Sequence, residues 1–343
     1  MWSRARCCTM IDLLSGGQCS SLRPKNIDRD PFDDSSANRS SAAIPKIGAM
    51  PELADITVYA ESIERLLQGA VLDKILLPNV FLLRTVEPPI GALSGKRLIR
   101  VERLGKRIVL AFEDDLFAVI HLMIAGRFKW FAKGEKVPVT KLVMARFEFD
   151  GGTLVVTEAG TKRRASLHLV RGRDALLAHD PGGINPLECT LDQFSKRLTK
   201  ENHTLKRALT DPRFISGIGN AYSDEILHRA KLSPLALSQK LLPDEIARVH
   251  AATRDVLDEW LQRLRAEARD GFPEKVTAFR TEMTVHGKFK QPCPVCGGLV
   301  QRIVYADNEC NYCPTCQTGG KLLADRALSR LLKASWPKRV DDV

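Results

Sequence analysis

The stretch 293–316, CPVCGGLVQRIVYADNECNYCPTC, decides the fold of the C-terminal part of this chain. It holds two C-x-x-C pairs, Cys293 with Cys296 and Cys313 with Cys316, which are separated by sixteen residues. Each pair can present two thiolates from one knuckle, and four thiolates complete the tetrahedral coordination of Zn²⁺. We therefore predict a zinc ribbon that binds one structural Zn²⁺.

The use of cysteine favours metal binding over disulfides. Five of the nine cysteines lie within 293–316, in a large chain that has no signal sequence, and such clusters in a reducing compartment bind metal. Four unrelated buried cysteines would not explain the spacing. We expect residues 300–304 and 310–312 to form the two strands between the knuckles, and Cys310 to be a small buried apolar residue rather than a ligand. Zinc ribbons occur in many nucleic-acid proteins, so this site alone does not identify a function.

The region before the ribbon has the pattern of a helical domain. Thr190 and Gln193 form a capping-box pattern at the start of a helix. Further helices are expected over 202–209, 220–231 and 243–268. The expected buried stripe of the last helix consists of Ile246, Val249, Val256, Leu257, Trp260 and Leu264.

A glycine-rich turn opens the second of these helices, where residues 214–227 read FISGIGNAYSDEIL. Gly217 and Gly219 allow a close approach of the backbone to a ligand, and the free N–H groups of the first helical turn attract anions. Lys206 and Asn220 are candidate donors to the same phosphate. Taken by itself, a Gly-Ile-Gly sequence is as consistent with a purely structural turn.

The region after Met50 predicts one helix followed by short strands. The apolar face of the helix is expected to comprise Ile56, Tyr59, Ile63, Leu66 and Leu67, with a stop at Gly69. Short apolar or alternating runs follow at 74–77, 80–83, 107–112, 117–122, 146–149 and 153–157. Gly151 and Gly152 separate the last two runs, which is a hairpin signal. Short strands with close turns predict an antiparallel β-sandwich, so the whole chain is expected to be an α+β protein.

Five segments follow from these patterns. They are a disordered extension or misassigned translation start at 1–49, a β-sandwich domain at 50–184, a helical domain at 185–284, the zinc ribbon at 285–320 and a basic amphipathic tail at 321–343. The family resemblance described below implies that the first domain is catalytic and that the second binds DNA.

The charge of the chain suggests a polyanionic partner. Its 343 residues carry a formal net charge of +11, and the pI is about 9.3. A Lys or Arg placed on a phosphate releases counterions, which favours nucleic acid as the partner. No apolar run approaches the roughly 20 residues that cross a bilayer. We expect a monomer that binds no membrane and lies in the cytoplasm, in association with the nucleoid.

The order of these elements resembles the formamidopyrimidine-DNA glycosylase and endonuclease VIII family. Residues 202–234 are similar to its helix–two-turn–helix motif, and the ribbon stands where that family carries its finger. Residues 50–53, MPEL, resemble its N-terminal signature, and 101–122 resemble its lysine-bearing strand pair. The resemblance covers about 51–317. It implies a DNA glycosylase with AP lyase activity on oxidised bases in damaged double-stranded DNA, with purines such as formamidopyrimidines and 8-oxoguanine ahead of pyrimidines.

The resemblance also implies three catalytic residues. Pro51 would be the nucleophile that attacks C1′ through its ring nitrogen, Glu52 the general acid, and Lys106 the lysine that holds backbone phosphate and assists β-elimination. A terminal α-amine has a pKa near 8, against about 10.4 for Lys, so more of it is neutral and reactive at pH 7. Without the resemblance, Pro51 and Glu52 simply suit the start of a helix, and Lys106 suits a solvated strand edge.

The DNA contacts implied by the resemblance lie in two loops. His121 stands at a DNA-contacting position, and Met123 or Ile124 would be the wedge beside the flipped base, although both are equally suited to a core. The second loop carries the basic residues Lys162, Arg163 and Arg164.

The chain departs from the family pattern at four places. Ala54 and Asp55 replace a proline and a glutamate, and the loop with the three basic residues lacks an aromatic ring. Asn308 stands where the finger has a phosphate-binding arginine that is tied to δ-elimination. Residues 271–275 replace the usual glycine- and threonine-rich loop that covers the base.

Catalysis by Pro51 also needs a chain that begins there. An internal proline nitrogen lies in a peptide bond and has no nucleophilic lone pair, whereas a start at Met50 followed by removal of that methionine exposes it. The alternative from another class is a non-catalytic zinc-ribbon protein that binds damaged or single-stranded DNA. A third is a zinc-ribbon RNA or translation factor, which would bind RNA and undamaged DNA equally well.

Overall fold

The computed structural model describes residues 50–160, 162–269, 271–273, 280–305, 308–323 and 338–340. The expectations for 1–49 and for nearly all of the tail at 321–343 therefore lie outside the described residues. Among the helices that are described, none combines the length and apolar character needed to span a bilayer.

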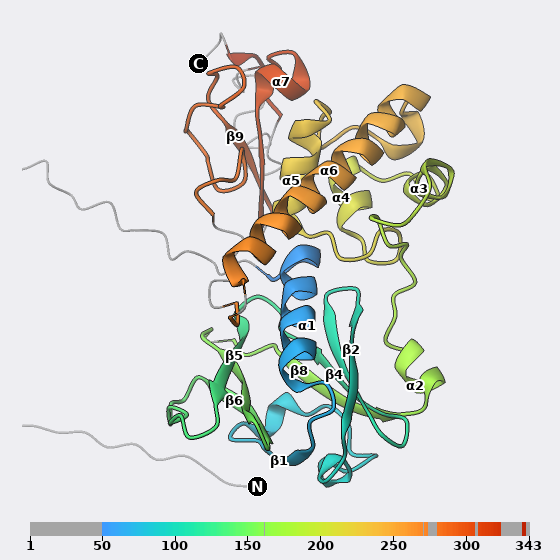
Figure 1. The fold of residues 1–343 in the computed structure, drawn as a ribbon. Helices are drawn as coiled ribbons and strands as arrows, with labels where there is room; N and C mark the ends of the chain where they lie inside the picture. The colour runs from blue at the N-terminus through green and yellow to red at the C-terminus, as the bar shows by residue number, and fades with distance from the viewer. Residues whose placement is uncertain are drawn as a thin grey trace, which may run out of the picture. The chain divides into compact units, whose positions relative to one another are not determined.

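Two four-stranded antiparallel sheets follow the first helix (Figure 1). One has the strand order β1-β6-β7-β5 and the other β2-β3-β4-β8, and a shared core of apolar side chains joins them. The strands are β1 (Leu72–Leu76), β2 (Leu98–Leu104), β3 (Arg107–Phe112), β4 (Leu116–His121), β5 (Gly126–Ala132), β6 (Val143–Phe149), β7 (Gly152–Glu158) and β8 (Ser166–Arg171). The predicted antiparallel β-sandwich is confirmed, and β6 pairs with β7 as the glycine turn predicted.

Two details of the sequence prediction for this region are wrong. Residues 80–83 form no strand, because Val80–Leu82 is a 3-10 turn (η1) in which the Asn79 side chain accepts a hydrogen bond from the N–H of Phe81. The Phe81 side chain is 78% exposed, so its apolar character does not report burial. Leu66 is also exposed, because it lies at the edge of the buried face of its helix. Two further 3-10 turns are η2 (Ile90–Leu93) and η3 (Ser238–Lys240).

Seven α-helices are described, and most of them lie after the sandwich. They are α1 (Leu53–Leu67), α2 (Arg173–Leu177), α3 (Leu191–Leu198), α4 (Leu205–Thr210), α5 (Asn220–Arg229), α6 (Pro243–Ala268) and α7 (Pro314–Thr318). The capping box at Thr190 and Gln193 is present at the start of α3, and the bounds predicted for α6 are confirmed. Its expected stripe is buried from Val249 to Leu264, whereas Ile246 is only partly buried.

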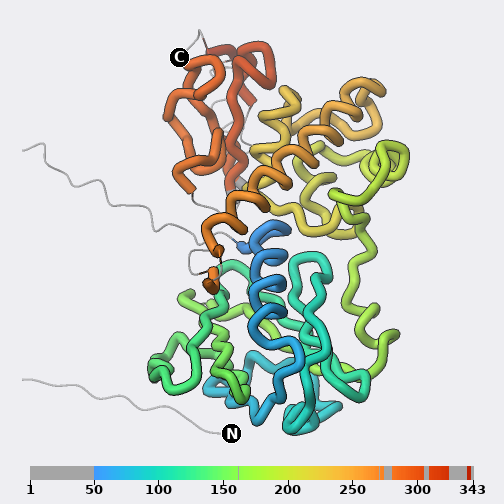
Figure 2. Tube along the Cα trace, viewed as in Figure 1, coloured from blue at the N-terminus to red at the C-terminus, as the bar shows by residue number. Residues whose placement is uncertain are grey.

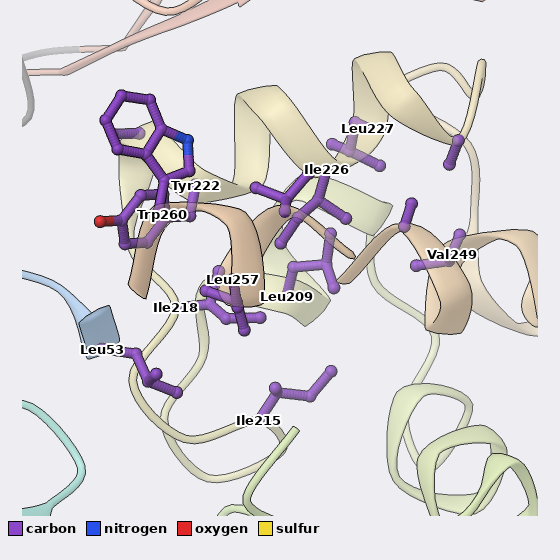
Figure 3. Packing of buried hydrophobic residues seen from close by; sticks show 14 of the residues in the cluster. Leu53, Leu209, Ile215, Ile218, Tyr222, Ile226, Leu227, Val249, Leu257 and Trp260 are labelled. Carbon is purple, nitrogen blue, oxygen red and sulfur yellow. The ribbon is translucent and has the colours of Figure 1, made fainter. Parts of the chain in front are cut away.

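Helix α1 contributes to two separate cores. Leu53, Ala54 and Val58 belong to the core formed with α4, α5 and α6, and Figure 3 shows Leu53 with Ile215 and Ile218 at one edge of that core. The opposite face of α1, which includes Ile56, Tyr59, Ile63 and Leu67, packs into the β-sandwich. Burial of both faces holds the start of α1 firmly at the junction of the two cores.

The C-terminal ribbon is a two-stranded antiparallel hairpin, drawn in red and orange in Figure 2. Strand β9 (Gln301–Tyr305) pairs with β10 (Asn308–Tyr312), and α7 follows directly. The predicted ribbon is confirmed, and its predicted strands fall close to those observed. Cys310 is 1% exposed and packs with Ile303 and Tyr312, as expected for a small apolar residue.

Candidate active site and metal centre

The carboxylate of Glu52 binds the start of α5. One oxygen, Oε2, accepts hydrogen bonds from the backbone N–H of Gly219 at 2.6 Å and of Tyr222 at 3.2 Å, and Oε1 accepts one from Ala221 at 2.8 Å. The positive end of a helix stabilises a negative charge, so Glu52 can stay buried at 2% exposure. Pro51 precedes it and is also buried.

The glycine-rich turn binds an anionic group of the chain itself, because the N–H of Gly219 donates to the Glu52 carboxylate. The phosphate contact of Gly217 and Gly219 stays a prediction. Gly217 has a φ of +83°, and its carbonyl oxygen accepts a hydrogen bond from the N–H of Leu53 at 2.9 Å. The two glycines thus join the start of α1 to the start of α5.

Asp55 completes a reciprocal cap with Glu52. Its Oδ2 accepts a hydrogen bond from the N–H of Glu52 at 2.9 Å, and the side chain is 2% exposed. Burial raises the pKa of Asp55 to about 6, and the hydrogen bond from Glu52 opposes that shift. A buried carboxyl group that titrates near neutral pH therefore lies one helical turn from Pro51.

The β2–β3 hairpin brings Lys106 to the same place. Gly105, with a φ of +63°, and Lys106 form the two-residue turn between the paired Leu104 and Arg107. A Cβ built on Gly219 would lie 2.6 Å from the Lys106 Nζ and 2.5 Å from the Glu52 carboxyl carbon, so both groups are close to this backbone. Burial lowers the pKa of Lys106, and the Glu52 carboxylate opposes the shift. All three predicted catalytic residues thus converge.

Lys206 stands in the first turn of α4, and its Nζ donates to Asp224 Oδ1 at 2.6 Å and to the Asn220 carbonyl at 2.7 Å. Its predicted phosphate contact stays a prediction. His286 contacts the other oxygen of Asp224 at 2.7 Å. Burial favours the neutral form of Asp224, but Lys206 and His286 hold its pKa below the ordinary value. The Lys206 ammonium group is therefore part of a buried ion-pair network.

Asn220 faces the ribbon with its side chain. Its Nδ2 donates to the backbone carbonyl of Glu309 in β10 at 2.8 Å. This contact makes Asn220 a link between α5 and the ribbon, in addition to the phosphate contact that the sequence predicts.

His121 ends β4 next to the two wedge candidates. Its Nδ1 accepts a hydrogen bond from the N–H of Met123 at 3.1 Å, so Nδ1 carries no proton there. Burial lowers the pKa of His121 to about 4, with Arg107 adding to the shift, and the ring is neutral at pH 7. Met123 has a φ of +52°, and both Met123 and Ile124 are half-buried, outside the core clusters.

Lys162, Arg163 and Arg164 all have exposed side chains. Hydrogen bonds to a buried carboxylate hold the end of the loop that carries them. The Glu158 carboxylate accepts hydrogen bonds from the N–H groups of Arg164 at 2.8 Å and Ala165 at 3.2 Å. Three exposed cations that follow one another in the chain suit a contact with phosphates.

The four predicted zinc ligands lie together. The Cys293 and Cys316 sulfurs are 4.0 Å apart, and the Cys296 and Cys313 sulfurs are 3.3 Å apart. Zn–S bonds of about 2.3 Å in a tetrahedron place sulfurs roughly 3.8 Å from one another, so the donor set fits zinc. One neighbour was not predicted from any sequence motif: His228 of α5 lies beside Cys293.

Two buried aromatic residues, Tyr59 and Tyr222, have contacts that the sequence did not predict. Tyr59 is buried and lies edge-on to Phe128, with ring centroids 5.4 Å apart, and Phe272 lies 5.7 Å from it. Tyr222 is buried at the start of α5, where its N–H donates to Glu52. Apolar periodicity classed Tyr59 as an ordinary core residue, and no local pattern relates 59 to 128 or 272.

Known proteins match this chain over its described domains. Residues 50–165 match the formamidopyrimidine-DNA glycosylase N-terminal domain, 177–269 match the formamidopyrimidine-DNA glycosylase H2TH domain, and 290–319 match the zinc finger found in FPG and IleRS. The last match confirms the predicted zinc finger.

Two curated relatives illustrate the similarity. An uncharacterized formamidopyrimidine-DNA glycosylase-like protein of Mycobacterium tuberculosis is 42% identical over 159 residues, which cover 44% of this chain and 94% of that protein. The formamidopyrimidine-DNA glycosylase of Pelotomaculum thermopropionicum is 28% identical over 78% of this chain and 99% of its own length.

Solved structures show the same fold. MutM (Fpg) from Thermus thermophilus is 29% identical, with a TM-score of 0.66, over 78% of this chain and 98% of that one. MutM in complex with DNA that contains carbocyclic 8-oxo-G has a TM-score of 0.69 over 78% of this chain and 100% of that one; at 23% identity it supports the fold. From these matches and the geometry of Glu52, Lys106 and the ribbon, the chain belongs to the formamidopyrimidine-DNA glycosylase family, a family of DNA glycosylases and AP lyases.

Proposed function

We propose that this chain removes oxidised bases from double-stranded DNA and then cleaves the abasic strand, with the ring nitrogen of Pro51 as the nucleophile. The observation that carries the proposal is the convergence of Pro51, Glu52 and Lys106 at the start of α5. Three backbone N–H groups hold the Glu52 carboxylate in one position, next to the residue that would attack. Such fixed geometry is what covalent catalysis needs.

The chemistry follows from these positions. The neutral ring nitrogen of Pro51 attacks C1′, the glycosidic bond breaks, and the base leaves with the bonding electrons and gains a proton. The nitrogen then loses its own proton, its lone pair expels the sugar ring oxygen O4′, and an iminium ion forms at C1′. Glu52 is the general acid for the oxygen or the base. Loss of a C2′ proton then expels the 3′ phosphate, which Lys106 holds.

The nucleophile exists only where Pro51 begins the chain. With residues 1–49 attached, the nitrogen of Pro51 lies in a peptide bond and its lone pair is delocalised. We infer that the active form begins at Pro51, either through initiation at Met50 and removal of that methionine or through proteolysis. The helix that starts at Leu53 adds a positive end beside the amine, which favours its neutral form.

The substrate class rests on the names of relatives. Curated relatives are formamidopyrimidine-DNA glycosylases, and one similar structure contains carbocyclic 8-oxo-G DNA, so oxidised purines are the proposed lesions. His121, Met123 and Ile124 would lie at the flipped nucleotide. The proposed phosphate contacts are Lys162, Arg163, Arg164, Lys206, Gly217, Gly219 and Asn220. We propose that 50–184, 185–284 and 285–320 are the functional domains, with 1–49 and the tail at 321–343 outside them, and that the chain works as a monomer at the nucleoid.

Borohydride trapping tests this proposal. The chain that begins at Pro51 and the chain that keeps residues 1–49 are each incubated with a duplex that contains an abasic site, in the presence of borohydride. Only the first should form a covalent adduct, because only it carries a free ring nitrogen. Pro51→Gly should weaken or abolish the adduct, whereas Pro78→Gly, a change at an exposed proline of the sandwich, should leave it intact.

The alternative is a non-catalytic protein that binds damaged or single-stranded DNA. It predicts binding to the abasic duplex without any adduct, from either chain. An adduct that Pro51→Gly leaves unchanged in amount would contradict a need for the proline ring, since the glycine keeps a free α-amine at the same position.

A further inference from the structure

One side chain outside the two C-x-x-C pairs lies against the sulfurs of the ribbon. His228 belongs to the last turn of α5, is 5% exposed, and has its Nε2 3.3 Å from the Cys293 Sγ. The ligand atoms of His228, Cys293, Cys313 and Cys316 all lie within 4.8 Å of one another. The Cys296 sulfur lies 3.3 Å from that of Cys313, so five potential donors stand near a centre that has four coordination positions.

We propose that His228 donates a hydrogen bond from Nε2 to the zinc-bound thiolate of Cys293 and so couples the metal to α5. Zn²⁺ with four thiolates has a net charge of −2, and a buried charge needs hydrogen-bond donors in place of water. Cys293 is 2% exposed, so water does not serve it, whereas Cys296 is exposed. An N–H donor near a ligating sulfur orients the ligand and withdraws charge from it.

The two C-x-x-C pairs favour a donor over a fifth or substitute ligand, because they already supply four thiolates. The sulfurs of Cys296 and Cys313 are 3.3 Å apart, and those of Cys293 and Cys316 are 4.0 Å apart, which are separations that two thiolates on one Zn²⁺ can have. Direct ligation by His228 would require one sulfur to leave. The 3.3 Å separation between Nε2 and the Cys293 Sγ is the length of an ordinary hydrogen bond to sulfur.

Helix α5 then has an anchor at each end. Its first turn holds the Glu52 carboxylate through Gly219 and Ala221, and its last turn holds the metal centre through His228. Between them, Glu225 accepts hydrogen bonds from the N–H groups of Val285 and His286, the first two residues of the ribbon segment, each at 2.9 Å. Zinc binding thus stabilises the helix that positions Glu52. This inference depends on the zinc site and not on catalysis by Pro51.

Zinc release and cobalt spectroscopy of the full chain test the proposal. Zinc transfer to a colorimetric chelator is timed for the wild-type chain, His228→Phe, His228→Gln and the control His250→Phe, which changes a histidine of α6. His228→Phe should release zinc roughly tenfold faster, because loss of an outer hydrogen bond to a ligand typically weakens metal binding about 10- to 100-fold. His228→Gln should stay near wild type, because its amide nitrogen takes the place of Nε2.

The cobalt-substituted chains separate a donor from a ligand. Wild type, His228→Phe and His228→Gln should all show the absorption of cobalt bound to four thiolates, whereas a shift of the ligand-field bands on loss of the imidazole would make His228 a ligand and overturn the proposal. Equal release rates for His228→Phe and His250→Phe would also overturn it.

A comparison of His228→Asn with His228→Gln tests the proposal even if His228→Phe fails to fold. His228→Asn and His228→Gln carry the same amide, but only the glutamine nitrogen reaches the position of Nε2. Faster zinc release from the Asn variant supports the hydrogen bond, and equal release from the two contradicts it.

Discussion

Glu52 and Asp55 are two buried carboxyl groups of the site that differ in how many N–H groups they accept hydrogen bonds from. Glu52 is stabilised by three N–H groups from α5, whereas Asp55 receives one N–H group, from Glu52 itself. Burial without enough donors penalises the charged form of a carboxylate. The two acids are three residues apart, and Asp55 has its pKa raised to about 6.

Replacing Asp55 with Asn should therefore change how stability depends on pH. The pKa of Asp55 is about 6 in the folded chain, against an ordinary value of 3.8, so the folded chain binds the proton more tightly. The stability that this gives is fully present below about pH 4 and is lost as the pH rises through 6. Asn stays neutral and does not lose this stability. The free energy of unfolding of Asp55→Asn minus that of wild type should therefore be about 1–2 kcal/mol larger at pH 7.5 than at pH 5.

Urea unfolding at the two pH values measures this difference. Asp73→Asn, at an exposed position of β1, is the control and should keep a constant difference from wild type. An Asp55→Asn curve that runs parallel to wild type across this range would show that Asp55 does not titrate there.

At the scale of elements, the close approach of α1, α5 and the β2–β3 hairpin depends on Gly219. A Cβ at this position would lie 2.5 Å from the Glu52 carboxyl carbon and 2.6 Å from the Lys106 Nζ. Gly219→Ala should push both groups away and lower the rate of base excision at least about a hundredfold, since a displacement of about 1 Å has that effect on catalysis. Single-turnover assays measure it.

Gly91→Ala is the matched control for Gly219→Ala. Its Cβ would meet no atom within 4 Å, and its φ is not in the left-handed region. It should excise bases at the wild-type rate. Wild-type activity in Gly219→Ala would contradict the assigned positions of Glu52 and Lys106.

Gly217 tests the packing of α1 against the turn before α5. Gly217 and Gly69 both have a φ of +83°, so alanine is strained equally at both, at a cost of about 1–2 kcal/mol. Only at Gly217 would the new Cβ meet another residue, since it would lie 2.9 Å from the Leu53 Cβ. Gly217→Ala should therefore lower the free energy of unfolding by about 1–3 kcal/mol more than Gly69→Ala. Equal losses in urea unfolding would mean that Leu53 does not pack there.

Local sequence patterns predicted the helices and strands well, but they did not predict the contacts between them. The bounds of α6 and the cap of α3 follow from periodicity and capping within one segment, and the ribbon follows from two short cysteine motifs. The strand predicted at 80–83 was wrong, because an apolar stretch of sequence does not show whether its side chains are buried or exposed. The bond between Glu52 and Gly219 spans 167 positions, and the contact between His228 and Cys293 spans 65, so no local pattern predicts either.

At the scale of the whole molecule, the exposed arginines differ in whether they form an ion pair with a carboxylate of the chain. The formal net charge is +11, and the exposed Arg163 and Arg164 lie on the loop that Glu158 supports. By contrast, Arg100 and Arg173 both form ion pairs with Glu102, at 2.6 and 2.8 Å. Composition predicted a polyanionic partner, but only the structure separates these two kinds of arginine.

Salt dependence of DNA binding distinguishes a phosphate contact from general attraction. Replacing both Arg163 and Arg164 with Ala should weaken binding and reduce the slope of log K against log salt by up to about 1.8, at about 0.9 for each phosphate contact. The double variant of Arg100 and Arg173 removes the same charge but should change the slope little. Equal slopes for the two double variants would show that the loop makes no specific phosphate contact.

The central claim concerns one atom, the ring nitrogen of Pro51, and locating the trapped sugar tests it most directly. The adduct between abasic DNA and the chain that begins at Pro51 is reduced, digested and analysed by tandem mass spectrometry. The account predicts that the reduced sugar is attached to the N-terminal proline, one residue before the Glu52 that the start of α5 holds in place. Attachment to Lys106, to Lys206 or to any other amine would contradict it.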